Sequence, residues 1–266
     1  MTDTICILLY HSVSDRAPAA FAPWAVTPGQ FAAHLDRVTD LGFSAITVGE
    51  LVRRRDAGLP LPDRTVVITF DDGFADFASH AWPELDRRGL PSTLYVTAGA
   101  IGGTSTWLDG LNAGDLPVLT APQLRTLDAG GVEIGSHSLT HPHLDCLPAG
   151  QARREIEESK QVLESVLGHR VDTFAYPHGY HSRRVKDAVA AAGYTSAAAV
   201  RNRLSPRGDD RFALARVTIT ADCTVDQLER VLDGGSVAVA RPGERLQTTV
   251  WRNVRRVRHT MAERRA

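Results

Sequence analysis

Hydrophobic residues along this chain follow two alternating patterns, one typical of buried strands and one typical of amphipathic helices. Continuous β-favouring runs, such as 5–10 and 65–70, predict strands that are buried on both faces. Between such runs, apolar residues recur at helical spacing, as at Phe31, Leu35 and Val38. The alternation of the two patterns predicts an α/β protein.

Four glycines mark points at which a predicted helix ends and a strand begins. Short β-favouring runs follow Gly42, Gly89, Gly130 and Gly193, at 44–48, 93–97, 132–135 and 195–200. Repetition of this unit predicts a parallel sheet with outer helices. With about seven or eight strands to place, a closed or nearly closed barrel is favoured over an open doubly wound sheet. The first strand is followed by no Gly-x-Gly-x-x-Gly turn, which argues against a dinucleotide-binding fold.

Composition narrows the class of protein. With 266 residues and a formal net charge of −1, the chain is long enough for one large domain and has no overall basic field for nucleic acid. Three cysteines without Cys-x-x-Cys spacing exclude a disulfide scaffold and a thiolate metal site. The first apolar run is far shorter than the roughly 20 residues that span a bilayer and has no basic flank, so we expect a cytoplasmic protein without a signal peptide. The alternative is that a leader was removed before this numbering began.

Two adjacent carboxylates, Asp71 and Asp72, directly follow the strand predicted at 65–70 and precede Gly73. Like charges at the end of a buried strand repel, unless a cation lies between them or one group has a raised pKa. The alternative is an Asp-Asp-Gly turn that only caps the strand.

Polar residues also follow three other predicted strands. They are His11 after the first strand, His137 after a later one, and the group Tyr176, Pro177 and His178. Because α/β barrels assemble their active sites at the carboxyl ends of their strands, we expect these residues to share one site with the aspartate pair.

His137 and His141 are four residues apart, which corresponds to one helical turn and would place both imidazoles on one face. The alternative is a polar loop with incidental histidines. Two imidazoles and one carboxylate form a three-ligand set for a catalytic zinc-type ion and leave one position for water. One aspartate of the pair could then bind the ion while the other handles a proton.

Three segments resemble the first three motifs of polysaccharide deacetylases with the NodB homology domain. They are Thr-Phe-Asp-Asp-Gly at 69–73, Ser-His-Ser-Leu-Thr-His-Pro at 136–142 and Phe-Ala-Tyr-Pro-His-Gly at 174–179. The resemblance runs from about residue 5 to residue 220. It implies a distorted (β/α)7 TIM-like barrel and metal-dependent removal of acetyl groups from sugars.

The resemblance also implies roles for single residues. By motif position, Asp71 is the general base, and Asp72, His137 and His141 hold a divalent ion, with Zn²⁺ expected and Co²⁺ or Ni²⁺ as alternatives. Ser138 is expected to brace the histidine loop.

The sequence departs from the family pattern at two points. The third motif often begins with an arginine that pairs with the catalytic aspartate, and here that position is Tyr176. Arg216 is our candidate replacement, with a surface salt bridge as the alternative. The late Leu-x-His motif has no match after Arg216, whereas Leu9-Tyr10-His11 matches it. This resembles the circularly permuted branch that acts on exopolysaccharide amino sugars. We therefore assign His11 as the general acid, with a core or capping histidine as the alternative.

Substrate contacts are expected from the third motif and from one loop. By family analogy, the backbone N–H of His178 in the Tyr176-Pro177-His178 segment holds the oxyanion. Trp107 lies in a Gly- and Ser-rich connection and could stack on a sugar ring or anchor the loop. Four histidines outside the motifs are expected to be solvated, namely His34, His80, His169 and His259.

We divide the chain into a catalytic barrel at 1–225 and a C-terminal helical extension with a basic tail at 226–266. An apolar stripe in the tail is surrounded by arginines, so the tail could lie on an anionic membrane or a partner, or form a closing helix with a solvated face. The stripe is formed by Val250, Val254, Val257 and Met261, and the arginines are Arg252, Arg255, Arg256, Arg258, Arg264 and Arg265.

The sequence therefore predicts a metal-dependent hydrolase that removes N-acetyl groups from an amino-sugar-containing carbohydrate. One alternative is a deacylase of a small amide or glycolipid, and another is an inactive carbohydrate-binding relative. The inactive alternative requires the loss of a key residue, and all of them are present. The expected partner is an acetylated carbohydrate and not nucleic acid, and the sequence leaves the oligomeric state open.

Overall fold

Seven parallel strands pair side by side and close into a barrel in the computed structural model, which describes residues 4–235 and 238. Within this part of the chain, the strand order is β1-β11-β9-β8-β7-β6-β5, and β5 pairs with β1 again to close the ring. The predicted distorted (β/α)7 barrel is confirmed. Its strands are β1 (Thr4–Tyr10), β5 (Thr65–Phe70), β6 (Thr93–Val96), β7 (Glu133–Ser136), β8 (Thr173–Ala175), β9 (Ser196–Val200) and β11 (Leu214–Thr218).

Four short strands lie outside the ring. β4 (Ser44–Ile46) pairs with the first half of β5, and β10 (Ser205–Pro206) runs antiparallel to the start of β1. β2 (Ser12–Val13) and β3 (Ala25–Val26) form a separate small sheet just after the barrel strand β1.

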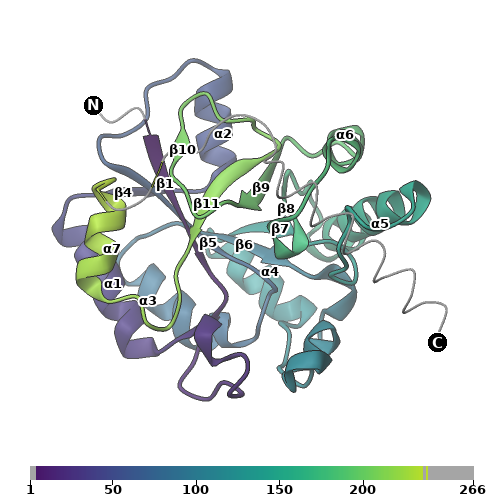
Figure 1. Cartoon of the computed structure of the whole chain (residues 1–266), viewed down its shortest axis with the longest axis horizontal. Coiled ribbons are helices and arrows are strands. Elements are labelled where there is room, and N and C mark those ends of the chain that lie inside the picture. Colours follow the sequence, from purple (N-terminus) through teal and green to yellow (C-terminus); the bar gives the residue numbers. More distant parts are fainter. Residues whose placement is uncertain (1–3, 236–237, 239–266) are drawn as a thin grey trace.

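Helices surround the barrel, as Figure 1 shows. They are α1 (Pro28–Asp40), α2 (Val48–Asp56), α3 (Trp82–Asp86), α4 (Ala121–Ala129), α5 (Ala149–Leu167), α6 (Arg183–Ala191) and α7 (Val225–Leu232). Shorter helical segments are η1 (Ala22–Trp24), η2 (Phe77–Ala81, a π-helical turn), η3 (Ala98–Ala100), η4 (Thr106–Leu111) and η5 (Pro177–Gly179).

Side chains of the barrel strands alternate between the interior and the outer helices, as the two-residue period of a strand requires. Ile5, Ile7 and Val67 belong to one hydrophobic cluster together with residues of α2, which closes one end of the barrel. Cys6, Leu8 and Ile68 belong to a second and larger cluster, which includes residues of the surrounding helices. The inward positions of β5 continue along the chain from Val67 through Thr69 toward Asp71.

His34 is buried, contrary to the expectation that it is solvated. Its Nδ1 lies 3.2 Å from the Tyr10 hydroxyl and its Nε2 lies 2.8 Å from the carbonyl oxygen of Cys223. Both ring nitrogens have hydrogen-bond partners because α1 packs directly over the end of β1.

Only the start of the predicted C-terminal extension falls within the described residues. There α7 contacts α1, where Arg37 and Glu229 form an ion pair of 3.2 Å. The stripe and arginines of the basic tail lie outside the described residues. Within 4–235, no helix combines the length and the apolar character needed to cross a membrane.

Candidate metal centre and active site

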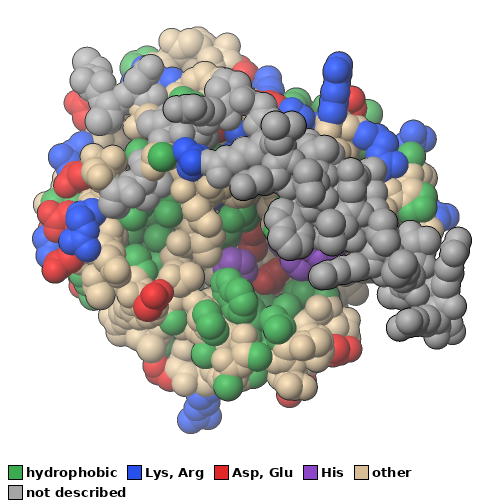
Figure 2. Space-filling model, in the orientation of Figure 1, with side chains coloured by type: hydrophobic (Ala, Val, Ile, Leu, Met, Phe, Trp, Pro, Cys, Tyr) green, Lys and Arg blue, Asp and Glu red, His purple; other side chains and the backbone are tan. Residues whose placement is uncertain are grey.

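The predicted site residues meet at the carboxyl ends of the barrel strands. Asp71 and Asp72 follow β5, His137 follows β7, His11 follows β1, and Arg216 lies within β11. Figure 2 shows histidine and acidic side chains together in a hollow on one face of the molecule, with hydrophobic side chains along one rim.

Asp72, His137 and His141 place one ligand atom each within 4.8 Å of one another. Asp72 Oδ1 lies 3.2 Å from His141 Nε2 and 3.6 Å from His137 Nε2. All three side chains are buried. These are the three residues that the motif pattern predicts as ligands, and their spacing would allow them to hold one small cation.

The hydrogen bond of His137 fixes which ring nitrogen faces the two aspartates. Its Nδ1 lies 2.9 Å from the carbonyl oxygen of Ala175, which can only accept, so Nδ1 carries the proton. Burial lowers the pKa of His137 to about 4, so the ring is neutral near pH 7. Nε2 therefore presents a lone pair toward Asp72.

This arrangement leaves the lone pair of His137 Nε2 facing a carboxylate oxygen inside a buried site. Asp72 Oδ1 is buried and accepts no hydrogen bond, although two histidine nitrogens lie close to it. A buried carboxylate oxygen without a partner is costly, and a divalent cation would satisfy it together with the lone pair of His137 Nε2. The donor set of one carboxylate and two imidazoles therefore fits a zinc-type ion.

Four residues of the site adopt the left-handed backbone region that L-residues rarely occupy. They are Asp72 (φ 76°), Ser138 (φ 66°), His141 (φ 63°) and His178 (φ 57°). Backbone strain of this kind costs of order 1–3 kcal/mol per residue and clusters at functional sites. Gly73 shares the conformation, and a Cβ there would lie 3.0 Å from Val96, which explains the glycine of the Asp-Asp-Gly turn.

The segment from His137 to His141 is a loop, so the prediction of one helical turn was wrong. Pro142 disfavours helical backbone at His141, and the loop finds its hydrogen bonds elsewhere. The His141 backbone N–H donates to Ser138 Oγ at 3.0 Å. Glu155 Oε2 on α5 accepts from the backbone N–H groups of Leu139 (3.0 Å) and Thr140 (2.8 Å). The two predicted ligands converge because the loop folds back, not because they share a helix face.

Glu155 is a site-supporting residue that the sequence interpretation missed. Its Oε1 also accepts from the Thr140 hydroxyl at 2.7 Å, so one carboxylate satisfies three donors between the two histidines. A weak signal was present, because Glu155 lies one turn from the buried residues Ala152 and Ser159 of the same helix. Other glutamates lie nearby on α5, and only the tertiary structure shows which of them reaches the histidine loop.

We expect Glu155→Ala to weaken metal binding by about tenfold to a hundredfold, since residues that orient metal ligands contribute on this scale. Glu155→Gln should bind nearly as wild type, because its amide oxygen can still accept from the loop and its NH₂ can donate to Thr140. Competition with a chelator, followed by metal analysis, measures the effect. Glu158→Ala, an exposed glutamate on the same helix, is the control. Equal binding by Glu155→Ala and wild type would contradict the prediction.

Asp71 forms a bidentate ion pair with Arg216. The distances are 2.6 Å from Nη1 to Oδ1 and 2.7 Å from Nη2 to Oδ2, and both residues are buried. Arg216 also donates to Thr69 Oγ1 at 3.2 Å. Burial by itself would raise the pKa of Asp71, but the charge of Arg216 holds it below its ordinary value. The alternative that Arg216 forms a surface salt bridge is thus excluded, because both partners are buried. The pairing keeps Asp71 ionised.

His11 lies next to the aspartate pair. The backbone N–H of Asp71 donates to the carbonyl of Tyr10 at 3.0 Å, which joins the ends of β5 and β1. His11 is half-buried and its Nδ1 has no hydrogen-bond partner. Burial would raise the pKa of Asp72, but His141 and then the nearby His11 lower it below its ordinary value, and His11 acts in the same direction on the pKa of Asp71. His11 is therefore within electrostatic range of both carboxylates.

Tyr176 departs from the expected substrate contact. Its side chain is fully buried, and its hydroxyl donates to the carbonyl of Phe212 at 2.9 Å. The structure thus places this side chain in the core, because the space beside Asp71 is filled by Arg216 from another strand. Pro177 is also buried and starts η5.

His178 and Trp107 both lie against the predicted ligand His141. The His178 ring is 4.6 Å from the His141 ring at 72°, and the Trp107 ring is 5.2 Å from it at 26°. Trp107 is half-buried and also contacts Phe74. The contact with Phe74 is the kind expected if Trp107 anchors its loop. The contact with His141 places the same ring beside the predicted ligands.

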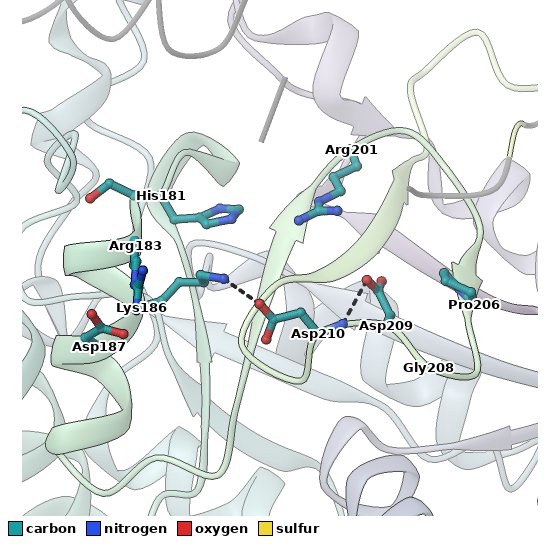
Figure 3. A pocket seen from close by; sticks show the side chains of 10 residues that line it. His181, Arg183, Lys186, Asp187, Arg201, Pro206, Gly208, Asp209 and Asp210 are labelled. Atoms are coloured by element: carbon teal, nitrogen blue, oxygen red, sulfur yellow. Dashed lines mark hydrogen bonds and ion pairs between the residues drawn. The ribbon is translucent and has the colours of Figure 1, made fainter. Parts of the chain in front are cut away.

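A second, polar pocket of about 450 Å³ lies between the start of α6 and the segment around β10. Figure 3 shows Lys186 reaching Asp210, at 2.5 Å. Asp209 accepts from Ser205 Oγ at 3.0 Å. These carboxylates are used within the fold, and the pocket contains none of the three predicted metal ligands.

Comparison with known proteins decides the family. The sequence profile of the polysaccharide deacetylase family matches residues 58–197, which is more than half of the chain. The chain belongs to the polysaccharide deacetylase family. The matched region contains the aspartate pair and both histidines, and membership supports a hydrolase that deacetylates carbohydrates.

Individual relatives agree with this assignment. YxkH of Bacillus subtilis, which is named as a polysaccharide deacetylase, is 25% identical over 214 residues, covering 80% of this chain and 71% of YxkH. The structure of IcaB from Ammonifex degensii matches with a TM-score of 0.75 at 22% identity, covering 87% of this chain and 98% of IcaB. The Streptococcus pyogenes deacetylase PplD matches with a TM-score of 0.74 at 22% identity, covering 86% and 98%. At this identity the two structures show the shared fold of the family.

Proposed function

We propose that this polysaccharide deacetylase family member is a metal-dependent hydrolase that removes N-acetyl groups from an amino-sugar-containing carbohydrate. The observation that carries the proposal is the buried convergence of Asp72, His137 and His141 beside an ionised Asp71. Family membership supports the carbohydrate class, and the related deacetylase PplD was solved in complex with acetate, which is consistent with an acetyl group as the one removed.

Asp72, His137 and His141 would hold the ion, which we expect to be Zn²⁺, with Co²⁺ or Ni²⁺ as alternatives. When bound, a divalent ion would polarise the acyl carbonyl and acidify water at the site. Asp71 is then the base that takes a proton from the attacking water, and Arg216 keeps its carboxylate ionised for that task. The backbone N–H of His178 is our candidate donor to the oxyanion.

His11 is the proposed general acid. An amide nitrogen is a poor leaving group until it is protonated, so the reaction needs a proton donor in addition to the base. His11 lies at the same strand ends as Asp71 but comes from a different strand, which would let the substrate nitrogen lie between them. Each proton transfer should contribute on the order of 10²–10⁴ in rate.

Acetate release from N-acetylglucosamine oligomers, measured alongside the metal content, tests the proposal. We expect about one divalent ion per chain, turnover of the oligomers, and loss of turnover after chelation that returns when the metal is restored. Metal binding without acetate release from any acetylated amino sugar would contradict the carbohydrate substrate. A protein that binds no divalent ion would contradict the whole mechanism.

A further inference from the structure

His11 leads directly into β2, a two-residue strand that lies outside the barrel. One edge of β2 pairs with β3, in the register Ser12 with Ala25 and Val13 with Val26. A strand this short makes few backbone hydrogen bonds of its own, so its position depends on side chains that reach it from elsewhere.

Two side chains from the segment after β5 reach β2. Ser12 Oγ donates a short hydrogen bond to Asp76 Oδ2. His80 Nδ1 lies 2.8 Å from the carbonyl oxygen of Val13, so this nitrogen carries a proton and donates it to the carbonyl. Both residues that follow His11 are therefore tied to the segment that begins at the aspartate pair.

Asp76 is itself held firmly relative to that pair. Phe77, the next residue, packs its ring 4.8 Å from the ring of Phe70 at 78°, and both rings are buried. Phe70 in turn directly precedes Asp71. The contact between Ser12 and Asp76 thus joins the segment that carries His11 to the segment that carries Asp71 and Asp72.

A carboxylate is an unusual group at this position if its only role is to connect two segments of the chain. Its Oδ1 is buried and has no hydrogen-bond partner, which costs stability. Burial raises the pKa of Asp76 to about 6, although hydrogen bonds from Ser12 and the Val13 backbone act in the opposite direction. A group kept at such a cost four residues after the metal ligand Asp72 points to a role in the site.

We propose that Asp76 is a positioning residue that holds His11 in line with the Asp71–Asp72 pair through Ser12. The inference rests on the proposed function, because it assigns Asp76 to the step in which His11 protonates the leaving amine. The Asp76 carboxylate binds Ser12 and lies outside the cluster of the three predicted ligands, so it acts on the reaction through His11.

The proposal can be tested with two substrates, one whose leaving group must be protonated by His11 and one whose leaving group needs no proton. An amide nitrogen must be protonated to leave, whereas 4-nitrophenolate leaves from 4-nitrophenyl acetate without a proton. We expect Asp76→Ala to lower kcat on N-acetylglucosamine oligomers by about tenfold to a hundredfold, a part of what a positioned acid contributes. Ester hydrolysis and metal content should change less than about threefold. Ser12→Ala should show the same pattern to a smaller extent.

A double-mutant cycle distinguishes loss of His11 positioning from a general destabilisation of the fold. Because Asp76 acts through His11, Asp76→Ala in a His11→Ala background should cost less than about twofold on the amide substrate. Ser14→Ala is the matched control, since Ser14 Oγ accepts from the Arg16 backbone rather than contacting Asp76. Additive losses in the double variant, or equal losses on amide and ester, would overturn the positioning role.

Failure of the proposed function would look different. In that case the wild-type protein would release no acetate from any amide, whatever residue occupies position 76. The imidazole NMR signals of His11 would then still test the positioning. We expect one resolved conformation in the wild type and exchange between several in Asp76→Ala, and an unchanged His11 signal would overturn the inference.

Discussion

Asp71→Asn is expected to lower kcat by about 10²–10⁴ while the protein keeps its metal, because an amide cannot accept the proton of the attacking water. The asparagine side chain can still accept a hydrogen bond from Arg216, so the geometry next to the ligands should be preserved. Asp72→Asn is the matched variant, and it should lose the metal together with the activity, since a neutral amide is a much weaker ligand. Metal per chain and acetate release rate, measured on the same samples, distinguish the two.

The two variants together divide the roles within the aspartate pair. Loss of metal and activity to the same extent in both variants would show that Asp71 and Asp72 both bind the ion. Retention of metal by Asp72→Asn would remove Asp72 from the ligand set, in spite of its 3.2 Å approach to His141.

Arg216→Met should destabilise the fold by about 3–5 kcal/mol, because it leaves the buried carboxylate of Asp71 without its partner. The variant should also change the pH dependence of activity. Arg216 holds the pKa of Asp71 low against the opposing effect of burial, so removing Arg216 raises that pKa. Since Asp71 must be ionised to act as a base, the acidic limb of kcat/KM should move to higher pH. Chemical unfolding and a pH–rate profile measure the two effects.

Two further variants show whether the loss comes from the unpaired charge. Asp71→Asn combined with Arg216→Met removes both charges and should recover much of the stability without recovering activity. Arg53→Met breaks an exposed ion pair with Glu50 and should change the stability by no more than about 1 kcal/mol. Stability of Arg216→Met equal to that of Arg53→Met would contradict the importance of the buried pair.

Much of the fold could be predicted from local patterns. The run at 65–70 is the strand β5, and Thr27, which directly precedes α1, accepts a hydrogen bond from the Gln30 backbone at 3.2 Å, a local N-cap contact. The Gln30 side chain donates to the carbonyl of Cys223 at 2.6 Å, a partner that no local pattern indicates. Local hydrogen bonds follow from sequence spacing, whereas contacts between distant segments depend on how the helices pack.

The candidate site divides in the same way. The sequence by itself determined which candidate residues lie at one end of the barrel, because Asp71, Asp72, His137 and His141 occur in motifs that follow strands of one parallel barrel. The tertiary structure decided which groups meet. Arg216 reaches Asp71 because both occupy inward positions on strands separated by β1, and this register is a property of the closed barrel.

The supports of the site were also decided by tertiary structure alone. Glu155 satisfies the loop between the two histidines, and Asp76 holds the segment after His11, yet in the sequence each is one acidic residue among many. The physical reason is that a polar group acquires its role from the partner that long-range folding places beside it. Strand and helix patterns set where each side chain points, and the closure of the barrel sets what it meets.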